Sequence, residues 1–359
     1  MQRHLICLVL ALLSAVFCCQ PKEQPPLIKT VPTAPAALPH DLYAHDWAGT
    51  EWWYYTGHLK DDAGKSYGFE VTFFRFRPDP EMMKTRLGKS MVGYMAHLAV
   101  TEEDAARYRN DILGGVEGRL AGAAADRYHV FVGDWSVEGD EKSQRLRAKN
   151  REIGVDLTVE PDKGYVFHGA GGVVPKGAGL ANYYISNPRM KASGKLFLDG
   201  REIPVSGMVW FDREFGYMGS TPVKGWDWFS LQLDDRTEYM IYRVRRDQNG
   251  FVPESKACRI DAEGREECIP ANECSFDIIS RWKSEKTKGV YPATWRVACE
   301  KIGLDSLIIP AVPEQEFAEG LPYWEGSCKV IGRPANGVGF VELVGYAEVG
   351  PHGKGKGKK

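Results

Sequence analysis

The segment Gly207–Gly216 (GMVWFDREFG) carries the residue of this 359-residue chain whose surroundings best suit acid chemistry. Side chains alternate between the two faces of a strand, so Trp210 and Asp212 share one face and Arg213 lies on the other. An apolar environment raises the pKa of a carboxyl because it disfavours the charged form, which would keep Asp212 protonated and able to donate. Asp212 is therefore the candidate general acid. The alternative is a structural role, in which Asp212 pairs with Arg213, Arg189 or backbone amides.

Aromatic and histidine side chains in the predicted strands are the candidates for a ligand-binding surface. The chain has ten Trp and sixteen Tyr residues, and aromatic faces attract cations where water is excluded. The candidate ligand-binding residues are Trp53, Tyr55, His58, His97, His168, Tyr184, Trp210, Trp226 and Trp228. The alternative for each is a packing role, because tryptophan is commonly a core residue and a lone histidine in a strand is commonly a satisfied structural one.

Other patterns that could support catalysis are weak. Glu51 and Glu70 lie among aromatic residues, and we expect them to pair with Arg75 or Arg77 rather than to bind a buried hydroxyl. The glycine-rich stretch 169–179 is not followed by the GK[ST] of a phosphate loop, and the chain lacks the GxSxG motif of a serine hydrolase. We therefore expect no cofactor, and a hydrolase is the least favoured enzyme class.

The cysteines of the folded body lie in its second half, at Cys258, Cys268, Cys274, Cys299 and Cys328. Asp261–Gly264 (DAEG) is typical of a hairpin turn and could place Cys258 and Cys268 on facing strands, so a disulfide between these two is favoured. A zinc site is the rival interpretation, but no CxxC or HxxxH spacing supports it, so we expect no metal. The remaining connectivity stays open.

Charge and hydropathy exclude several classes of protein. The chain has 46 Lys and Arg residues against 48 Asp and Glu residues, a net charge of −2, and a pI near 6.5, which does not favour binding to nucleic acid. The only long apolar run, residues 5–19, is shorter than the roughly 20 residues of a membrane-spanning helix. A polytopic membrane protein is therefore not expected.

The two ends of the chain indicate export. A basic start and the apolar run predict a secretory signal peptide over residues 1–19, and Cys18 or Cys19 could instead be the acylated residue of a lipoprotein. We expect residues 20–44 to be a Pro-rich linker and residues 349–359 to be a basic disordered tail. We expect a periplasmic or outer-membrane-associated protein that touches the membrane only through such a lipid anchor.

Period-two alternation dominates the body of the chain and predicts an all-β protein. The expected strands are 51–59, 67–77, 94–101, 128–135, 146–149, 154–159, 183–186, 189–198, 203–211, 227–233, 238–245, 250–260, 274–282, 291–299, 304–309, 320–330 and 338–345. Residues 102–124 are the one expected helix. About eight strands per half could close into two antiparallel β-barrels, at 45–218 and 219–348, with two β-sandwiches as the alternative.

Four segments carry a resemblance to a known family: 51–59 (EWWYYTGHL), 183–190 (YYISNPRM), 207–216 (GMVWFDREFG) and 225–229 (GWDWF). In order and spacing they resemble the AttH/CrtC family of tandem lipocalin-like proteins, whose named enzymes are the carotenoid 1,2-hydratases. The resemblance implies two tandem lipocalin-like barrels with a hydrophobic ligand space, and a hydratase chemistry known for some members. Many relatives carry His at the position of Arg213, and an arginine cannot replace a histidine in acid–base work because it stays protonated.

Two functions are expected from these observations. The first is an exported lipocalin-like protein that binds an apolar ligand, isoprenoid or acyl, at the cell envelope. The alternative is a cofactor-free hydro-lyase resembling carotenoid 1,2-hydratase, in which Asp212 protonates an isoprenoid double bond and aromatic residues support the cation. A third interpretation, a structural surface module, predicts filled barrels. The first two share a hydrophobic small molecule as partner.

Overall fold

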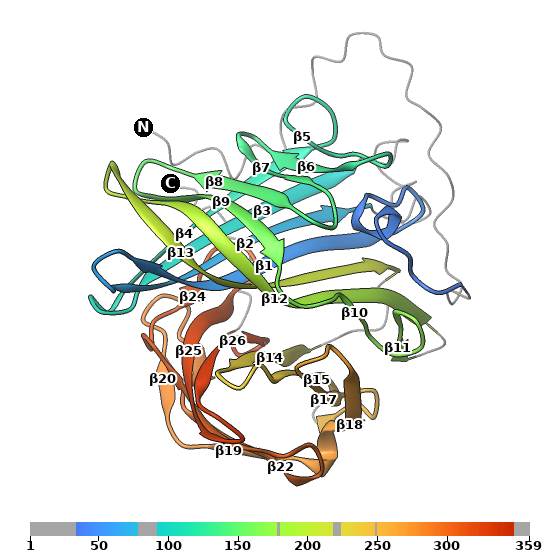
Figure 1. Cartoon of the computed structure of the whole chain (residues 1–359), viewed down its shortest axis with the longest axis vertical. Helices are drawn as coiled ribbons and strands as arrows, with labels where there is room; N and C mark the ends of the chain where they lie inside the picture. Colours follow the sequence, from blue (N-terminus) through green and yellow to red (C-terminus); the bar gives the residue numbers. More distant parts are fainter. Residues whose placement is uncertain (1–33, 78–91, 178–179, 218–223, 248–249, 348–359) are drawn as a thin grey trace, which may run out of the picture. The chain divides into compact units, whose positions relative to one another are not determined.

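The computed structural model describes residues 34–77, 92–177, 180–217, 224–247 and 250–347. Within these ranges the protein consists of antiparallel β-strands joined by turns (Figure 1). The helical segments described are 3₁₀ turns of three residues each, η2 (His40–Leu42), η3 (Ala271–Glu273) and η4 (Glu300–Ile302). Among the described residues, no helix has the length and apolar character needed to cross a membrane. The predicted signal peptide, the boundary at 218–219 and the C-terminal tail lie outside the described residues.

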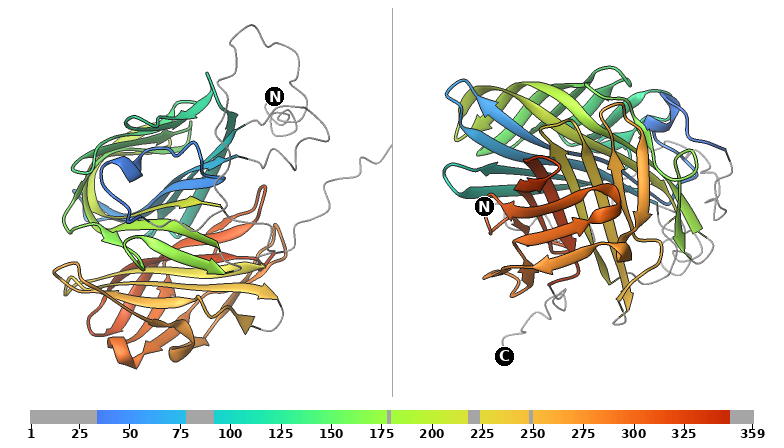
Figure 2. Two further views of the ribbon diagram at one scale, coloured as in Figure 1. Left: turned by 90° about the vertical axis from the view of Figure 1, so that its right-hand side faces the viewer. Right: turned by 60° about the horizontal axis from the view of Figure 1, so that its bottom comes forward.

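The chain divides into two compact units, each with one large curled sheet. The first unit comprises the described residues of 1–65, 69–100 and 110–220, and the second those of 66–68, 101–109 and 221–359. One sheet closes into a nearly complete barrel, and the other forms a half-barrel (Figure 2). The prediction of an all-β fold with two tandem barrels is therefore confirmed, with less complete closure in the second.

The first sheet contains thirteen described strands in the order β4-β3-β2-β1-β13-β12-β9-β8-β7-β6-β5, and β10 and β11 pair with β12. Their bounds are β1 (Thr50–Asp61), β2 (Ser66–Phe76), β3 (Gly93–Glu102), β4 (Arg107–Val116), β5 (Ala121–Ala123), β6 (Tyr128–Val132), β7 (Trp135–Gly139), β8 (Gln144–Lys149), β9 (Ile153–Pro161), β10 (Val166–Phe167), β11 (Val173–Gly177), β12 (Leu180–Leu198) and β13 (Arg201–Gly216). The long strands β1, β13 and β12 lie side by side and position the candidate site.

Alternation on β1 and β13 separates two sets of side chains. Trp53 lies opposite Arg213, and Tyr55 lies opposite Phe211, so these four residues share one face. All four are fully buried. Asp212 projects to the other face of the same strand.

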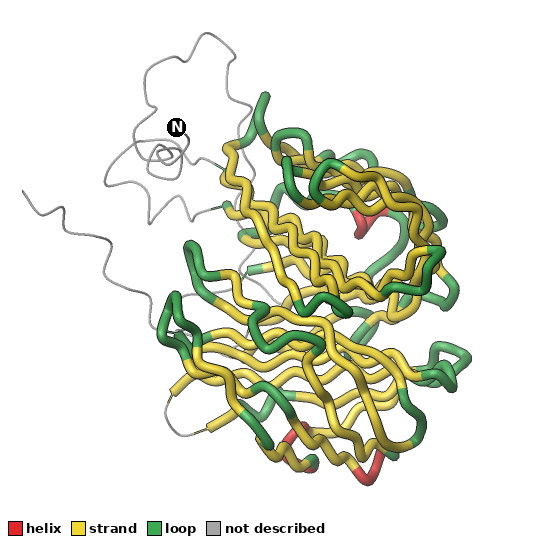
Figure 3. Tube along the Cα trace, turned by 90° about the vertical axis from the view of Figure 1, so that its left-hand side faces the viewer, coloured by secondary structure: helices red, strands yellow, loops and turns green. Residues whose placement is uncertain are grey.

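The second sheet contains eleven described strands in the order β18-β17-β15-β14-β26-β25-β23-β22-β19, with β16 on β15 and β24 on β25, and β20 and β21 form a separate pair. Strands and loops make up nearly all of the described chain (Figure 3). Their bounds are β14 (Gly225–Leu233), β15 (Glu238–Asp247), β16 (Gly250–Phe251), β17 (Lys256–Ile260), β18 (Glu266–Pro270), β19 (Ser275–Ile278), β20 (Arg281–Lys283), β21 (Val290–Pro292), β22 (Trp295–Cys299), β23 (Leu304–Pro310), β24 (Glu316–Phe317), β25 (Tyr323–Arg333) and β26 (Gly337–Val344). Its core includes Phe229, Leu231, Tyr239, Trp295 and Trp324.

The predicted helix is wrong, and the predicted strands 128–135, 250–260, 274–282 and 291–299 are each interrupted by a turn or loop between two strands. Residues 102–124 do not form a helix but the strands β4 and β5. The acidic residues that suggested a helix start lie at the end of β3 and in the turn to β4, where Ala106 has a φ of 50°. Pairing of β4 with β3 overrides the local helix propensity.

The last part of the predicted linker packs on the first unit. The Ala36 amide donates to the Gly171 carbonyl at 2.8 Å, and the Tyr183 hydroxyl donates to the Ala34 carbonyl at 2.7 Å. Leu42, in η2, is fully buried. Residues 34–44 are therefore part of the folded unit rather than an extended spacer.

Two disulfides stabilise the second unit. Cys258 and Cys268 lie opposite each other on β17 and β18 and are bonded, as the hairpin pattern predicted. A second disulfide joins Cys274 to Cys299, and Cys328 is a buried thiol.

Candidate functional site

Strands β12 and β13 bring the candidate acid together with three neighbouring side chains. Ser186 lies opposite Asp212 in the register, and Tyr184 lies opposite Glu214. Paired residues of an antiparallel sheet project to the same face, as do residues two apart on one strand. Tyr184, Ser186 and Trp210 therefore surround the Asp212 carboxylate.

The Asp212 carboxylate accepts three hydrogen bonds from these side chains. Trp210 Nε1 donates to Oδ1 at 2.7 Å, and the Tyr184 hydroxyl donates to Oδ2 at 2.7 Å. The Ser186 hydroxyl also donates to Oδ1. Oδ1 thus has two donors and Oδ2 has one, and the carboxyl is fixed in a single orientation.

His168, which directly follows β10, extends this network beyond Ser186. Its Nε2 lies 2.6 Å from Ser186 Oγ, and its ring centroid lies 4.6 Å from that of Tyr184. Because Ser186 gives its one proton to Asp212, Nε2 of His168 must carry a proton and donate it to Ser186 Oγ. His168, Ser186 and Asp212 form a continuous hydrogen-bonded chain.

Burial raises the pKa of Asp212 above that of an ordinary aspartate. Its side chain is 3% exposed, and the loss of hydration disfavours the charged form. The hydrogen bonds from Ser186, Tyr184 and Trp210 and the proximity of His168 oppose this effect without cancelling it. The carboxyl is thus held in one orientation, and its pKa lies above the ordinary value.

Neither arginine proposed as a structural partner contacts the Asp212 carboxylate among the described residues. Arg189 Nη1 lies 2.9 Å from Met208 Sδ, and Arg213 projects to the opposite face of β13. The side chains that donate hydrogen bonds to the Asp212 carboxylate are therefore the hydroxyls of Tyr184 and Ser186 and the indole of Trp210.

Arg213 is part of a separate ionic network centred on Glu51. Its guanidinium donates to Glu51 Oε2, and it lies 4.1 Å from the ring centroid of Trp53. Arg75 Nη1 donates to the other oxygen, Oε1, at 2.7 Å, as expected for Glu51. Burial alone would raise the pKa of Glu51, but the charge of Arg213, with further contributions from His45 and Arg75, lowers it to about 2.

Two of the predicted ligand-binding residues, Trp53 and Tyr55, lie on the Arg213 face and not with Asp212. The Trp53 indole donates to the Leu42 carbonyl at 2.8 Å. The Tyr55 hydroxyl contacts the hydroxyl of Tyr128 and donates to Gln144 Oε1 at 2.7 Å. Both are satisfied core residues of the first unit.

The predicted histidines separate into different environments. His168 joins the Asp212 network. His58 lies opposite Met208, so it is on the face of the sheet that carries Asp212. His97 lies on β3 with its ring centroid 5.1 Å from that of Phe74, and burial lowers its pKa to about 3.

Trp226 and Trp228 belong to the second unit. Both lie on β14, and alternation places them on the face opposite Phe229 and Leu231, which contribute to the core of that unit. Trp228 is buried and Trp226 is half-buried.

Comparison with known proteins shows the family of this chain. The AttH-like family model matches residues 29–346. The chain belongs to the AttH-like family. A candidate AttH from Nitrosomonas europaea is similar in structure, with a TM-score of 0.79 and 28% identity over 90% of this chain and 100% of that one. Kievitone hydratase from Nectria haematococca shares the fold, with a TM-score of 0.69 and 17% identity over 89% of this chain and 97% of that one. No curated protein sequence matches.

Sequence reasoning missed one part of the site in this AttH-like protein, Ser186. Ser186 bridges His168 and Asp212, and alternation from Tyr184 would have placed it on the same face. Glu214, two residues beyond Asp212, contacts Lys176 Nζ at 2.6 Å. That ion pair joins β11 to β13, which are distant in sequence.

The two cavities described in this AttH-like protein lie in the second unit. The larger, of about 340 Å³, is lined by Asp235, Thr237, Tyr239, Arg259, Glu267, Glu300, Lys301, Ile302, Gly303 and Pro334. The smaller, of about 200 Å³, is lined by Arg243, Phe251, Val252, Pro253, Ser255, Ala271, Asn272, Cys274 and Phe276. Neither is lined by a predicted site residue, and the many charged groups of the larger one do not suit an apolar ligand.

Proposed function

We propose that this AttH-like protein adds water to a carbon–carbon double bond of an apolar substrate, isoprenoid or acyl, with Asp212 as the proton donor. The observation that carries the proposal is a buried carboxyl with a raised pKa, oriented by Tyr184, Ser186 and Trp210. The shared fold with kievitone hydratase, a protein whose name states a hydration, supports it.

Hydration requires a proton, a cation and a water molecule in sequence. Asp212 protonates one carbon of the double bond, and the π electrons form the new C–H bond, which leaves a cation on the other carbon. Water adds to that carbon, and its surplus proton returns to the carboxylate, so the product is an alcohol and the acid is restored. No electrons are exchanged with a co-reactant.

The hydrogen bonds assign a role to each oxygen of the carboxyl. Oδ2 is the oxygen suited to carry the transferable proton, because it has one donor whereas Oδ1 has two. Trp210 Nε1 can only donate, so it stabilises the carboxylate that forms when the proton leaves. The indole also offers an aromatic face of the kind that attracts a cation.

The proposal includes export of the protein and binding of the apolar substrate at the cell envelope. Two disulfides, Cys258–Cys268 and Cys274–Cys299, support an oxidising compartment. Cell fractionation with a C-terminal epitope tag tests this part: recovery in the cytosol with reduced thiols would contradict it.

Turnover is tested with acyclic isoprenoids and unsaturated acyl chains incubated in isotopically labelled water. We expect the wild-type protein to yield an alcohol containing the labelled oxygen, detected by mass spectrometry. Asp212→Asn should lower the rate by about a hundredfold or more, the usual contribution of a general acid.

Glu214→Gln is the matched control, because it makes the same carboxyl-to-amide change two residues along the same strand, at a group paired with Lys176. It should retain turnover. Substrate binding is measured separately by tryptophan quenching. Binding without turnover by the wild-type protein would replace the hydratase proposal by a non-catalytic carrier of apolar ligands, and equal rates for wild type and Asp212→Asn would reject Asp212 as the acid.

A further inference from the structure

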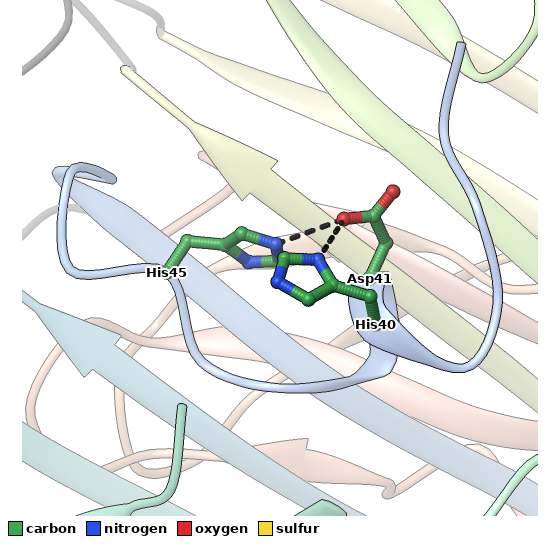
Figure 4. A group of neighbouring side chains, drawn as sticks. All are labelled: His40, Asp41 and His45. Carbon is green, nitrogen blue, oxygen red and sulfur yellow. Dashed lines mark hydrogen bonds and ion pairs between the residues drawn. The ribbon is translucent and has the colours of Figure 1, made fainter. Parts of the chain in front are cut away.

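Two histidines and an aspartate converge near the start of the first unit. His40 and Asp41 lie in η2, and His45 lies in the segment that leads to β1 (Figure 4). His40 Nδ1 lies 3.2 Å from Asp41 Oδ1, and His45 Nε2 lies 3.0 Å from the same oxygen. One ligand atom from each residue lies within 4.8 Å of the other two.

This spacing matches the donor set of a transition-metal site. Zinc binds imidazole nitrogen and carboxylate oxygen at about 2.0–2.2 Å, so neighbouring donors of a tetrahedral site lie roughly 3.3 Å apart. The distances from His40 Nδ1 and His45 Nε2 to Asp41 Oδ1, 3.2 and 3.0 Å, are close to that value. Two imidazoles and one carboxylate are also ligands that suit Zn²⁺ and related divalent ions.

The surroundings fix two of the three side chains in a ligating orientation. Asp41 Oδ2 accepts a hydrogen bond from the Ala37 amide at 2.6 Å, which leaves Oδ1 to face the imidazoles. The buried ring of His45 stacks on Phe215 with centroids 3.8 Å apart. Only the His40 ring, which is 71% exposed, must be ordered when a metal binds.

The second nitrogen of His45 has the partner that metal-binding histidines commonly have. Its Nδ1 lies 3.2 Å from Glu51 Oε2, the arrangement in which a carboxylate accepts the outer N–H of a ligating imidazole and leaves Nε2 available. Arg213 Nη2 lies 3.2 Å from the same Nδ1, but it also donates to the Tyr43 carbonyl at 2.6 Å and to Glu51. Arg213 Nη2 therefore keeps two acceptors, the Tyr43 carbonyl and Glu51 Oε2, when Nδ1 carries the proton.

We propose that His40, Asp41 and His45 form a binding site for a divalent transition metal, with Zn²⁺ as the best match. Three protein ligands leave a fourth position for water or another small donor. The spacing of these residues in the sequence matches no HxxxH pattern, because the three ligands lie on a 3₁₀ turn and the loop after it rather than on a regular helix. The site uses none of the residues assigned to Asp212 chemistry, so the two proposals can fail separately.

The test is zinc uptake by the purified full chain after treatment with a chelator. Titration calorimetry with ZnCl₂, and elemental analysis after dialysis, should give one zinc per chain that the wild-type protein retains. His40→Ala and Asp41→Asn should each weaken zinc affinity by about tenfold or more, the scale on which even outer-shell changes act. Zinc should raise the melting temperature of the wild type more than that of either variant.

His129→Ala is the control, because its imidazole stacks on Phe131 in β6 and lies outside the cluster. It should bind zinc like the wild type. His40→Ala removes an exposed ring, and circular dichroism checks that its fold is kept. Failure of the wild type to retain zinc, or equal affinities for the wild type, His40→Ala and Asp41→Asn, would overturn the proposal and leave the three residues as a hydrogen-bonded anchor of the first unit.

Discussion

The buried ion pair of Glu51 predicts how stability depends on pH. Glu51 is fully buried and bonded to both Arg213 and Arg75. Its pKa is about 2 in the folded protein against a reference value of 4.5. Because the folded-state pKa is lowered, the stabilisation is complete above pH 4.5 and is lost as the pH falls toward 2.

The size of this effect follows from the same values. A carboxyl whose pKa falls from 4.5 to about 2 on folding stabilises the native state by about 3 kcal/mol at neutral pH. About half of this remains at pH 3. Glu51→Gln also leaves two buried guanidiniums without their carboxylate, and breaking such a pair costs about 3–5 kcal/mol at pH 7.

Urea unfolding followed by tryptophan fluorescence measures the effect. The difference in unfolding free energy between wild type and Glu51→Gln should be largest at pH 7 and should shrink as the pH is lowered to 3. Glu202→Gln, which removes one partner of a surface pair with Lys195, should unfold like the wild type at every pH. A gap between wild type and Glu51→Gln that stays constant over this range, or that is below about 1 kcal/mol at pH 7, would refute the pKa argument.

Three further predictions follow from other contacts. If Asp212 must be protonated to act, the hydration rate should fall as the pH rises through the raised pKa of Asp212. Tyr184→Phe removes a hydrogen bond that stabilises the charged carboxylate, so it should move this fall to higher pH. Tyr183→Phe, the control, should leave the pH profile unchanged. Replacing Cys274 and Cys299 by serine should cost more unfolding free energy than replacing Cys258 and Cys268, by about 1 kcal/mol, because the sequence separation is 25 against 10. Gly57→Ala should destabilise the first unit by about 1–3 kcal/mol in thermal melts, because a Cβ would lie 2.5 Å from Phe69 Cε1; an unchanged melting temperature would contradict this steric reason.

Alternation along the strands was enough to predict which side chains share a face. It separated Trp210 and Asp212 from Arg213, and the register of β13 with β1 and β12 agrees with that division. The hairpin turn between Cys258 and Cys268 likewise predicted their disulfide, because the turn fixes the register of the two strands within a few residues. Strand alternation and tight turns can be predicted from sequence because each fixes the geometry of its own few residues.

What alternation could not supply was the identity of each face. Trp53 and Tyr55 had the same aromatic character as Trp210, yet they lie in the core that contains Tyr128, whereas Trp210 lies beside Asp212. Which face of a strand lies inside the barrel depends on the direction in which the sheet curls. That direction is set by all the strands of the sheet together. The wrong helix at 102–124 has a related cause, since the pairing of β4 with β3 decided its structure.

The consecutive residues Asp212 and Arg213 lie in different electrostatic environments on the two faces of β13. Arg213 faces Glu51, and opposite charges there hold both groups ionised in a buried position. Asp212 accepts hydrogen bonds from Tyr184, Ser186 and Trp210, and burial raises its pKa because these bonds and the nearby His168 do not cancel the loss of hydration. If Arg213 shared the Asp212 face, its charge would lower the pKa of Asp212 and oppose the proton donation proposed for it. The period-two geometry of β13 therefore places a buried ion pair and a carboxyl with a raised pKa at adjacent positions.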